Sequence, residues 1–193
     1  AFGDAGAYEE LGSLDTVILN AGTSEYVDPK QFDTSIVEHV LRTNLLACSY
    51  CIDAALPLLR AGTAPHMVAM ASTLTYLPLP KAEACGASRT GLRYLFESLR
   101  VDRAPEGIEV TVISPGFVEA PPVAKDDFSM PLSWPVDKAA RHIFEKLKDR
   151  PLEIALPAAF MATLWPLAKP PEQVKLEIGK PMVRSQPPSK DQL

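Results

Sequence analysis

The chain has 193 residues, a formal net charge of −5 and 22% charged residues. This length suits one domain with a substantial core, and the acidic balance argues against a nucleic-acid-binding surface, which needs a basic stripe. No apolar run reaches the roughly 18 residues of a membrane span. No secretory signal is visible, and the three cysteines fit no disulfide framework. We therefore expect a cytoplasmic globular protein.

The first predicted strand covers residues 15–19, a short continuous run of mostly apolar residues. Such a run is typical of a strand buried on both faces of a parallel sheet. It ends in Asn20, Ala21 and Gly22, and small residues at this point let a ligand approach the backbone closely. A tight turn explains the three residues equally well.

A long helix is predicted over about 34–59, with Asp33 or Thr34 as its cap. Asn44 lies in its apolar stretch, where an amide loses free energy unless it finds partners. It is either a satisfied core residue or a functional amide. Cys48 and Cys51 fall in mid-helix, where we interpret them as small packing residues and not as a redox or zinc motif.

An apolar run over 66–71 predicts a buried strand, and Ser72 follows it. In α/β sheets, ligands bind at the carboxyl ends of the strands. A serine at this point, facing the next helix, is therefore a candidate site residue. That helix is predicted over about 83–100 and carries Cys85 and Arg89 four residues apart, on one face.

The remaining chain predicts a strand at 109–113, a proline-rich loop at 119–135 with Met130 and Trp134, a helix capped by Asp137 and a last strand at 153–156. The apolar segment 160–167 is interpreted as core packing, with a subunit contact, a pocket wall and a membrane-surface patch as alternatives. We expect a single partial domain over 1–170 and a polar, poorly ordered tail over 171–193.

Four separated motifs together resemble the short-chain dehydrogenase/reductase family. Thirteen residues after Ser72 comes Cys85-Gly86-Ala87-Ser88-Arg89, similar to the family's Tyr-x-x-x-Lys signature. Asn20-Ala21-Gly22 resembles its Asn-Asn-Ala-Gly motif, Asn44 stands where the family has a catalytic Asn, and Pro115-Gly116 resembles its segment over the nicotinamide.

The resemblance implies a three-layer Rossmann-like parallel α/β sheet with helices on both faces. It also implies an oxidoreductase that uses NAD or NADP to act on a carbonyl or alcohol, and a homodimer or homotetramer formed through the helices at 34–59 and 83–100. The positions that correspond to the family's catalytic residues are Ser72, Asn44, Cys85 and Arg89. Those that correspond to its cofactor-binding residues are Asn20, Ala21, Gly22, Arg89, Pro115, Gly116 and Val118.

The chain also departs from the family pattern. Cys85 replaces the tyrosine and Arg89 the lysine, Ala120 replaces a frequent threonine, and no Gly-rich phosphate-binding turn is present in the sequence. A cysteine sulfur falls ~3–4 Å short of a tyrosine oxygen, too far for direct proton transfer. We expect impaired catalysis in a family domain that lacks its first three strands, which makes the strand at 15–19 an unpaired edge.

Three alternatives follow from these departures. The chain is a non-catalytic dimerisation or interaction module of the same fold, or an active oxidoreductase in which water or Tyr76 replaces the missing phenol, or a thiol-reactive protein that uses Cys85. No histidine partner for Cys85 is evident nearby in the sequence.

Overall fold

The computed structural model describes residues 12–119, 132–162, 173–174, 176–177 and 180. Within them a four-stranded sheet has the order β1-β2-β3-β6. Its strands are β1 (Thr16–Leu19), β2 (His66–Met70), β3 (Glu109–Pro115) and β6 (Glu153–Leu156). All neighbouring strands are parallel, so each pair needs a crossover connection.

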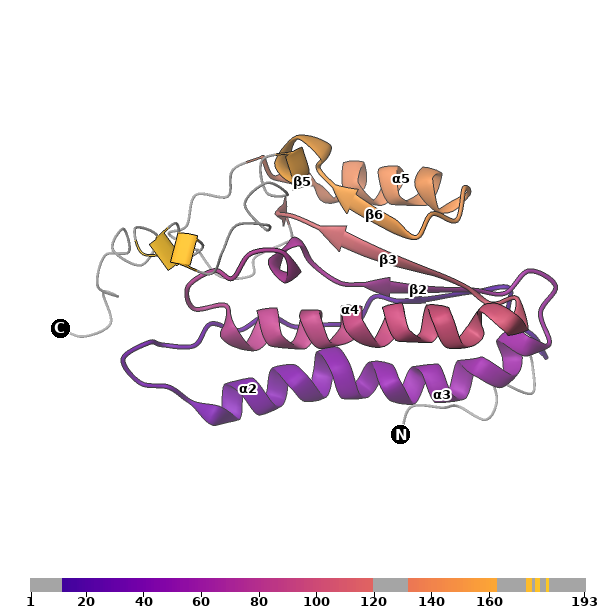
Figure 1. Ribbon diagram of the computed structural model, residues 1–193, viewed down its shortest axis with the longest axis horizontal. Coiled ribbons are helices and arrows are strands. Elements are labelled where there is room, and N and C mark those ends of the chain that lie inside the picture. The colour runs from indigo at the N-terminus through magenta and orange to yellow at the C-terminus, as the bar shows by residue number, and fades with distance from the viewer. Residues whose placement is uncertain (1–11, 120–131, 163–172, 175, 178–179, 181–193) are drawn as a thin grey trace.

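Helices cover both faces of this sheet and make three layers. They are α2 (Thr34–Leu41), the π-helical segment η1 (Arg42–Leu46), α3 (Ala47–Arg60), α4 (Glu83–Arg103) and α5 (Val136–Leu147). Figure 1 shows α2 and α3 running alongside α4 on one side of the strands, with α5 on the other side. The predicted Rossmann-like fold class is confirmed.

Shorter elements connect these layers. The 3-10 turns η2 (Thr73–Thr75) and η3 (Ala104–Glu106) flank α4. Strands β4 (Val118–Glu119) and β5 (Trp134–Pro135) pair beyond the end of β3.

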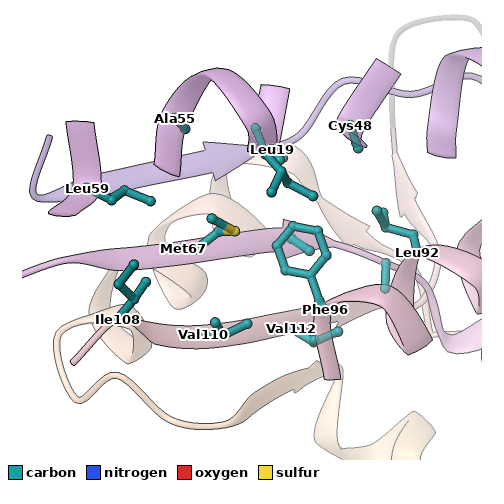
Figure 2. Close-up of a cluster of buried hydrophobic side chains, with 13 residues drawn as sticks. Leu19, Cys48, Ala55, Leu59, Met67, Leu92, Phe96, Ile108, Val110 and Val112 are labelled. Carbon is teal, nitrogen blue, oxygen red and sulfur yellow. The ribbon is translucent and has the colours of Figure 1, made fainter. Parts of the chain in front are cut away.

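The core divides into one cluster on each face of the sheet, because successive strand side chains point to opposite sides. On the α3–α4 side, Leu92 and Phe96 of α4 are fully buried, four residues apart on one face of the helix. In Figure 2 the aromatic ring of Phe96 lies close to Met67 and Val112. On the α5 side, Val68, Ile113 and Leu156 form the second cluster.

The prediction that the first strand is buried on both faces is wrong. In β1 only Leu19 is buried, and Ile18 is 49% exposed. The reason is its position: within the described residues β1 pairs with β2 alone and forms the edge of the sheet. An apolar run does not distinguish a central strand from an apolar edge.

The helix predicted over 34–59 is interrupted by η1, where the backbone N–H of Ala47 donates to the carbonyl of Arg42, five residues earlier. Asp33 does cap α2, accepting a hydrogen bond from the Ser35 N–H at 2.8 Å. Asp137 does not cap α5: Pro135 stands at the cap position and Asp137 lies in the first turn. The helix at 83–100 continues to Arg103.

Asn44 lies in η1 with no exposed surface, and its amide joins three segments. Its Oδ1 accepts from the Thr23 N–H at 2.7 Å, and its Nδ2 donates to the Thr23 carbonyl and to Ser88 Oγ, each at 2.9 Å. Both amide protons are therefore used within the protein. Asn44 clamps the loop after β1 and the first turns of α4 onto η1.

Several expectations lie outside the described residues: the helix end before Gly12, most of the proline-rich loop with Ala120 and Met130, the segment 163–167 and most of the tail. Among the helices that are described, none is both long and apolar enough to cross a membrane.

His66 is a buried imidazole at the start of β2. Thr111 uses its hydroxyl proton on the Pro151 carbonyl at 2.6 Å, so it accepts from His66 Nε2–H at 2.8 Å. Burial, and then the positive charge of Arg150, lower the pKa of His66 although Glu109 acts to raise it. The fold therefore holds His66 neutral.

We expect the free energy of unfolding to fall as the pH drops below about 6.5, the ordinary histidine pKa, until His66 is protonated in the folded state as well. In this window the unfolded chain binds more protons than the folded one. His66→Gln keeps a donor and removes the titration, so its urea midpoint depends less on pH. Parallel curves for wild type and His66→Gln contradict this account.

Asn44→Ala leaves the Thr23 backbone groups without their amide partner. We expect a total loss of about 1–3 kcal/mol of unfolding free energy, because the Thr23 groups are only partly buried and the buried Ser88 hydroxyl also loses its donor. Asn20→Ala is the matched control, because Asn20 is exposed and a surface change of this kind shifts stability by roughly 0.5 kcal/mol or less. Urea unfolding measures both, and equal losses in the two variants argue against the clamp.

Candidate active site

The predicted site residues lie at the carboxyl ends of the strands, which in a parallel sheet are all on the same side. Asn20, Ala21 and Gly22 follow β1, and Ser72 follows β2. Pro115 ends β3, and Gly116 comes directly after it. The register places Leu19 opposite Ala69 and Met70 opposite Ile113, so the three loops leave the sheet side by side.

Arg89 projects from α4 to the ends of β1 and β2. Its Nη1 donates to the Met70 carbonyl at 2.6 Å. Its Nη2 lies against Gly22, so close that a Cβ added to Gly22 would be 2.1 Å from Nη2. Gly22 is thus needed for this approach, because any larger residue displaces the guanidinium. One side chain connects the loops after β1 and β2.

Cys85 is buried one turn before Arg89, and its thiol is free. Ser88 Oγ donates to the Cys85 carbonyl at 2.9 Å while accepting from Asn44. The backbone of Cys85 is therefore tied to the Asn44 clamp. Within the described part of the chain, no hydrogen bond joins Cys85 Sγ to Ser72, Asn44 or Arg89.

Ser72 shapes the turn that follows β2. Its Oγ accepts from the Leu74 N–H at 3.1 Å, and its carbonyl accepts from Thr75 Oγ1 at 2.9 Å. Because the Oγ acts as acceptor in the first bond, its own proton is available to donate. The half-buried hydroxyl is in place to hold a ligand oxygen.

Pro115, Gly116 and Val118 form a separate group of contacts toward β6. The Gly116 N–H donates to the Leu156 carbonyl at 2.7 Å, and a Cβ at Gly116 would be 3.0 Å from the Phe160 ring. Val118 pairs with Trp134. Phe160 packs on this segment, with its ring centroid 5.8 Å from that of Phe117, and the interpretation of 160–167 as core stays a prediction because residues 163–167 lie outside the described ranges.

Asn20 and Ala21 line a cavity of about 200 Å³ between β1 and the helix that contains Asn44. Its other lining residues are Ile18, Leu19, Thr43, Ala47, Cys48 and Cys51. Cys48 is buried in the core cluster and Cys51 packs against that cluster, which confirms the interpretation of this cysteine pair as packing residues. Burial raises the pKa of the Cys48 thiol.

The sequence did not reveal a polar network beside this site. Arg93 of α4 contacts Glu153 of β6 through two parallel bonds, Nη1 to Oε1 at 2.7 Å and Nη2 to Oε2 at 2.9 Å. Ser114 Oγ donates to Glu153 at 2.8 Å, and Arg93 donates to the Tyr76 hydroxyl at 2.6 Å. The only sequence signal was one charge in each of two elements sixty residues apart.

Tyr76 donates its own hydroxyl proton to Glu153. Burial, and then this hydrogen bond, raise the pKa of Tyr76. Although burial acts to raise the pKa of Glu153, hydrogen bonds from Arg93, Tyr76 and Ser114 bring it below its ordinary value. The phenol is therefore held protonated and occupied. This geometry argues against the alternative in which Tyr76 replaces the missing phenol.

The resemblance places a ribose of NAD or NADP against Gly22 and residue 89. In this structure the space beside Gly22 is taken by the Arg89 guanidinium itself. Placed as they are, Gly22 and Arg89 do not fit a ribose between them.

Comparison with solved structures agrees with the architecture. A short-chain dehydrogenase from Burkholderia cenocepacia in complex with NADP is similar with a TM-score of 0.76 and 18% identity, over 95% of this chain and 73% of that one. A short-chain dehydrogenase from Streptomyces avermitilis is similar with a TM-score of 0.69 and 20% identity, over 94% and 74%. At these identities the likeness shows the fold.

Two curated relatives match in sequence. An uncharacterised oxidoreductase of Myxococcus xanthus is 29% identical over 167 residues, 86% of this chain and 63% of the relative. The cis-4-hydroxycyclohexanecarboxylate dehydrogenase of Sinomonas cyclohexanicum is 30% identical over 158 residues, 81% of this chain and 61% of the relative. The chain thus spans less than two thirds of the length of these relatives.

The family model of the short chain dehydrogenases matches residues 5–130. This match contains the Asn-Ala-Gly, Asn44, Ser72–Arg89 and Pro-Gly motifs together, on the parallel sheet that carries them. The chain therefore belongs to the short-chain dehydrogenase family.

Proposed function

We propose that the chain descends from NAD(P)-dependent oxidoreductases that act on carbonyl or alcohol substrates, and that this catalysis is impaired in the chain as given. One observation carries the proposal. Arg89 occupies the position of the family's lysine. Its guanidinium donates a hydrogen bond to the Met70 carbonyl and contacts Gly22. In the family, the lysine at this position contacts the cofactor and the catalytic tyrosine. In this chain, Arg89 at the same position contacts the backbone instead.

The proton chemistry supports the same proposal. Ser72 can donate its proton in a hydrogen bond to a substrate oxygen, but a general acid must stand within hydrogen-bond reach, or one water away. Cys85 is buried and its sulfur is not hydrogen-bonded to Ser72 within the described residues. Tyr76, the other phenol considered, is engaged by Arg93 and Glu153. Neither Cys85 nor Tyr76 is therefore placed to replace the missing tyrosine.

For the cofactor we propose NAD or NADP, bound weakly. The solved relative from B. cenocepacia is in complex with NADP. The three free cysteines of this chain suit a reducing compartment, which supports our proposal of a cytoplasmic location.

We expect the purified chain to show no NADH or NADPH turnover above that of its Ser72→Ala variant, over a panel of ketones, aldehydes and alcohols. The missing general acid alone lowers the rate by roughly 10²–10⁴-fold. Absorbance of the reduced nicotinamide measures turnover. Robust turnover that Ser72→Ala abolishes contradicts impaired catalysis.

A second candidate function is that of a dimerisation module, and exposed apolar side chains on α3 and α4 favour it. Leu46 directly precedes α3, and Tyr50 lies one turn later on that helix. Tyr94 and Val101 lie two turns apart on α4. Tyr94 and Val101 are each 73% exposed. Since these helices run alongside each other (Figure 1), we propose a homodimer or homotetramer formed through the helices at 34–59 and 83–100.

We expect Tyr94→Glu to shift the chain toward monomer in sedimentation velocity, because it places a charge at the centre of the proposed contact. Phe144→Glu is the matched control: Phe144 is also an exposed aromatic, at 64%, but it lies on α5 across the sheet. Dissociation by Phe144→Glu and not by Tyr94→Glu contradicts the proposed interface.

A further inference from the structure

Arg89 differs from Arg93, the next arginine along α4. Arg93, one turn further along, has carboxylate partners in Glu97 and Glu153. Arg89 is half-buried, and in the described ranges no carboxylate pairs with it; its hydrogen bond goes to a neutral carbonyl. Partial burial of a cation without a counter-charge costs free energy. The position of the guanidinium must therefore be fixed by the groups packed around it.

Three features fix that place. Gly22 has no Cβ, which lets Nη2 lie against the backbone. The neighbouring residue Thr23 is bound by Asn44 through both its N–H and its carbonyl, so this wall cannot easily move away. The opposite wall is the Met70 carbonyl, at the end of the central strand β2.

The planar fork of the guanidinium reaches both walls at once, with Nη1 on Met70 and Nη2 against Gly22. A lysine ends in a single compact ammonium, which cannot fill the same width. The replacement of lysine by arginine at this position therefore changes the shape of the site as well as its chemistry.

We propose that Arg89 closes the ribose part of the nucleotide site, so that a nicotinamide riboside enters only when the guanidinium leaves Met70 and Gly22. This inference rests on membership of the family and not on the proposed loss of catalysis. It makes residue 89 a specificity-determining residue that excludes the sugar. The guanidinium and a ribose compete for the same space.

The probe is reduced nicotinamide riboside, which is neutral and fluorescent. Because it has no phosphate, removing the Arg89 charge changes no ion pair with the probe. We expect Arg89→Ala to bind it at least tenfold more tightly than wild type, the factor expected for releasing one charge-assisted hydrogen bond, with Arg89→Lys in between. Arg141→Ala, which removes an exposed arginine on α5, keeps the wild-type affinity. No gain in Arg89→Ala overturns the proposal.

Reduced nicotinamide mononucleotide, which adds a phosphate, distinguishes closure of the site by Arg89 from binding of an anion by Arg89. If Arg89 instead binds anionic oxygens, wild type takes the mononucleotide more tightly than Arg89→Ala does. That order overturns the closure. The reverse order, with Arg89→Ala tighter for both probes, supports it.

A second variant moves the guanidinium without removing it. In Gly22→Ala the new Cβ displaces Nη2, so we expect Arg89 to react faster with phenylglyoxal than in wild type, with the exposed Arg141 as internal reference in peptide mass spectrometry. If Arg89 of the wild type already reacts as fast as Arg141, the closure is wrong.

The two proposals fail separately. Wild type that binds the riboside as tightly as Arg89→Ala yet shows no turnover contradicts the closure and leaves impaired catalysis standing. Turnover by Arg89→Ala, with none by wild type, supports the closure and assigns the lost activity to Arg89 and not to Cys85.

Discussion

The site depends on one buried amide. Asn44 holds both backbone groups of Thr23 and the hydroxyl of Ser88, and through Ser88 it reaches the carbonyl of Cys85. The loop after β1 and the start of α4 are separate in sequence, and this amide gives them a common anchor. The π-helical register of η1 is what brings Asn44 inward, and such bulges are frequent at functional sites.

The two arginines near this amide, Arg93 and Arg89, differ in the groups that they contact. Arg93 and Glu153 satisfy each other and draw in Tyr76 and Ser114, so α4 is tied to β6 and the turn after Ser72. Arg89 has a carbonyl and a glycine instead of a carboxylate. Arg93 thus ties elements of the fold together, whereas Arg89 has no carboxylate partner within the described residues and occupies the sequence position of the family's lysine.

Much of the architecture could be predicted because its signals are local. The apolar run at 66–71 predicted β2, short strand patterns predicted β3 and β6, and four separated motifs, with the spacing from Ser72 to Arg89 among them, indicated the family. What failed depended on neighbours in space. The apolar run at 15–19 predicted burial on both faces, whereas Ile18 is exposed because β1 has one neighbour within the described residues; the edge itself was expected from the resemblance to the family. The π-helical segment η1 was not predicted. Neither the contact of Arg89 with Gly22 nor the bond between Arg93 and Glu153 has a pattern in sequence.

The small buried surface of β1 also bears on how long the site stays assembled. Within the described residues, Leu19 is the one buried residue of β1, and local opening begins in segments with few buried apolar contacts. The loop that carries Gly22 and Thr23 is the direct continuation of β1. Opening of this strand would release Gly22 from Arg89 and strain the bonds to Asn44 without unfolding the rest. We therefore expect the lifetime of the contact between Gly22 and Arg89 to follow the local stability of β1.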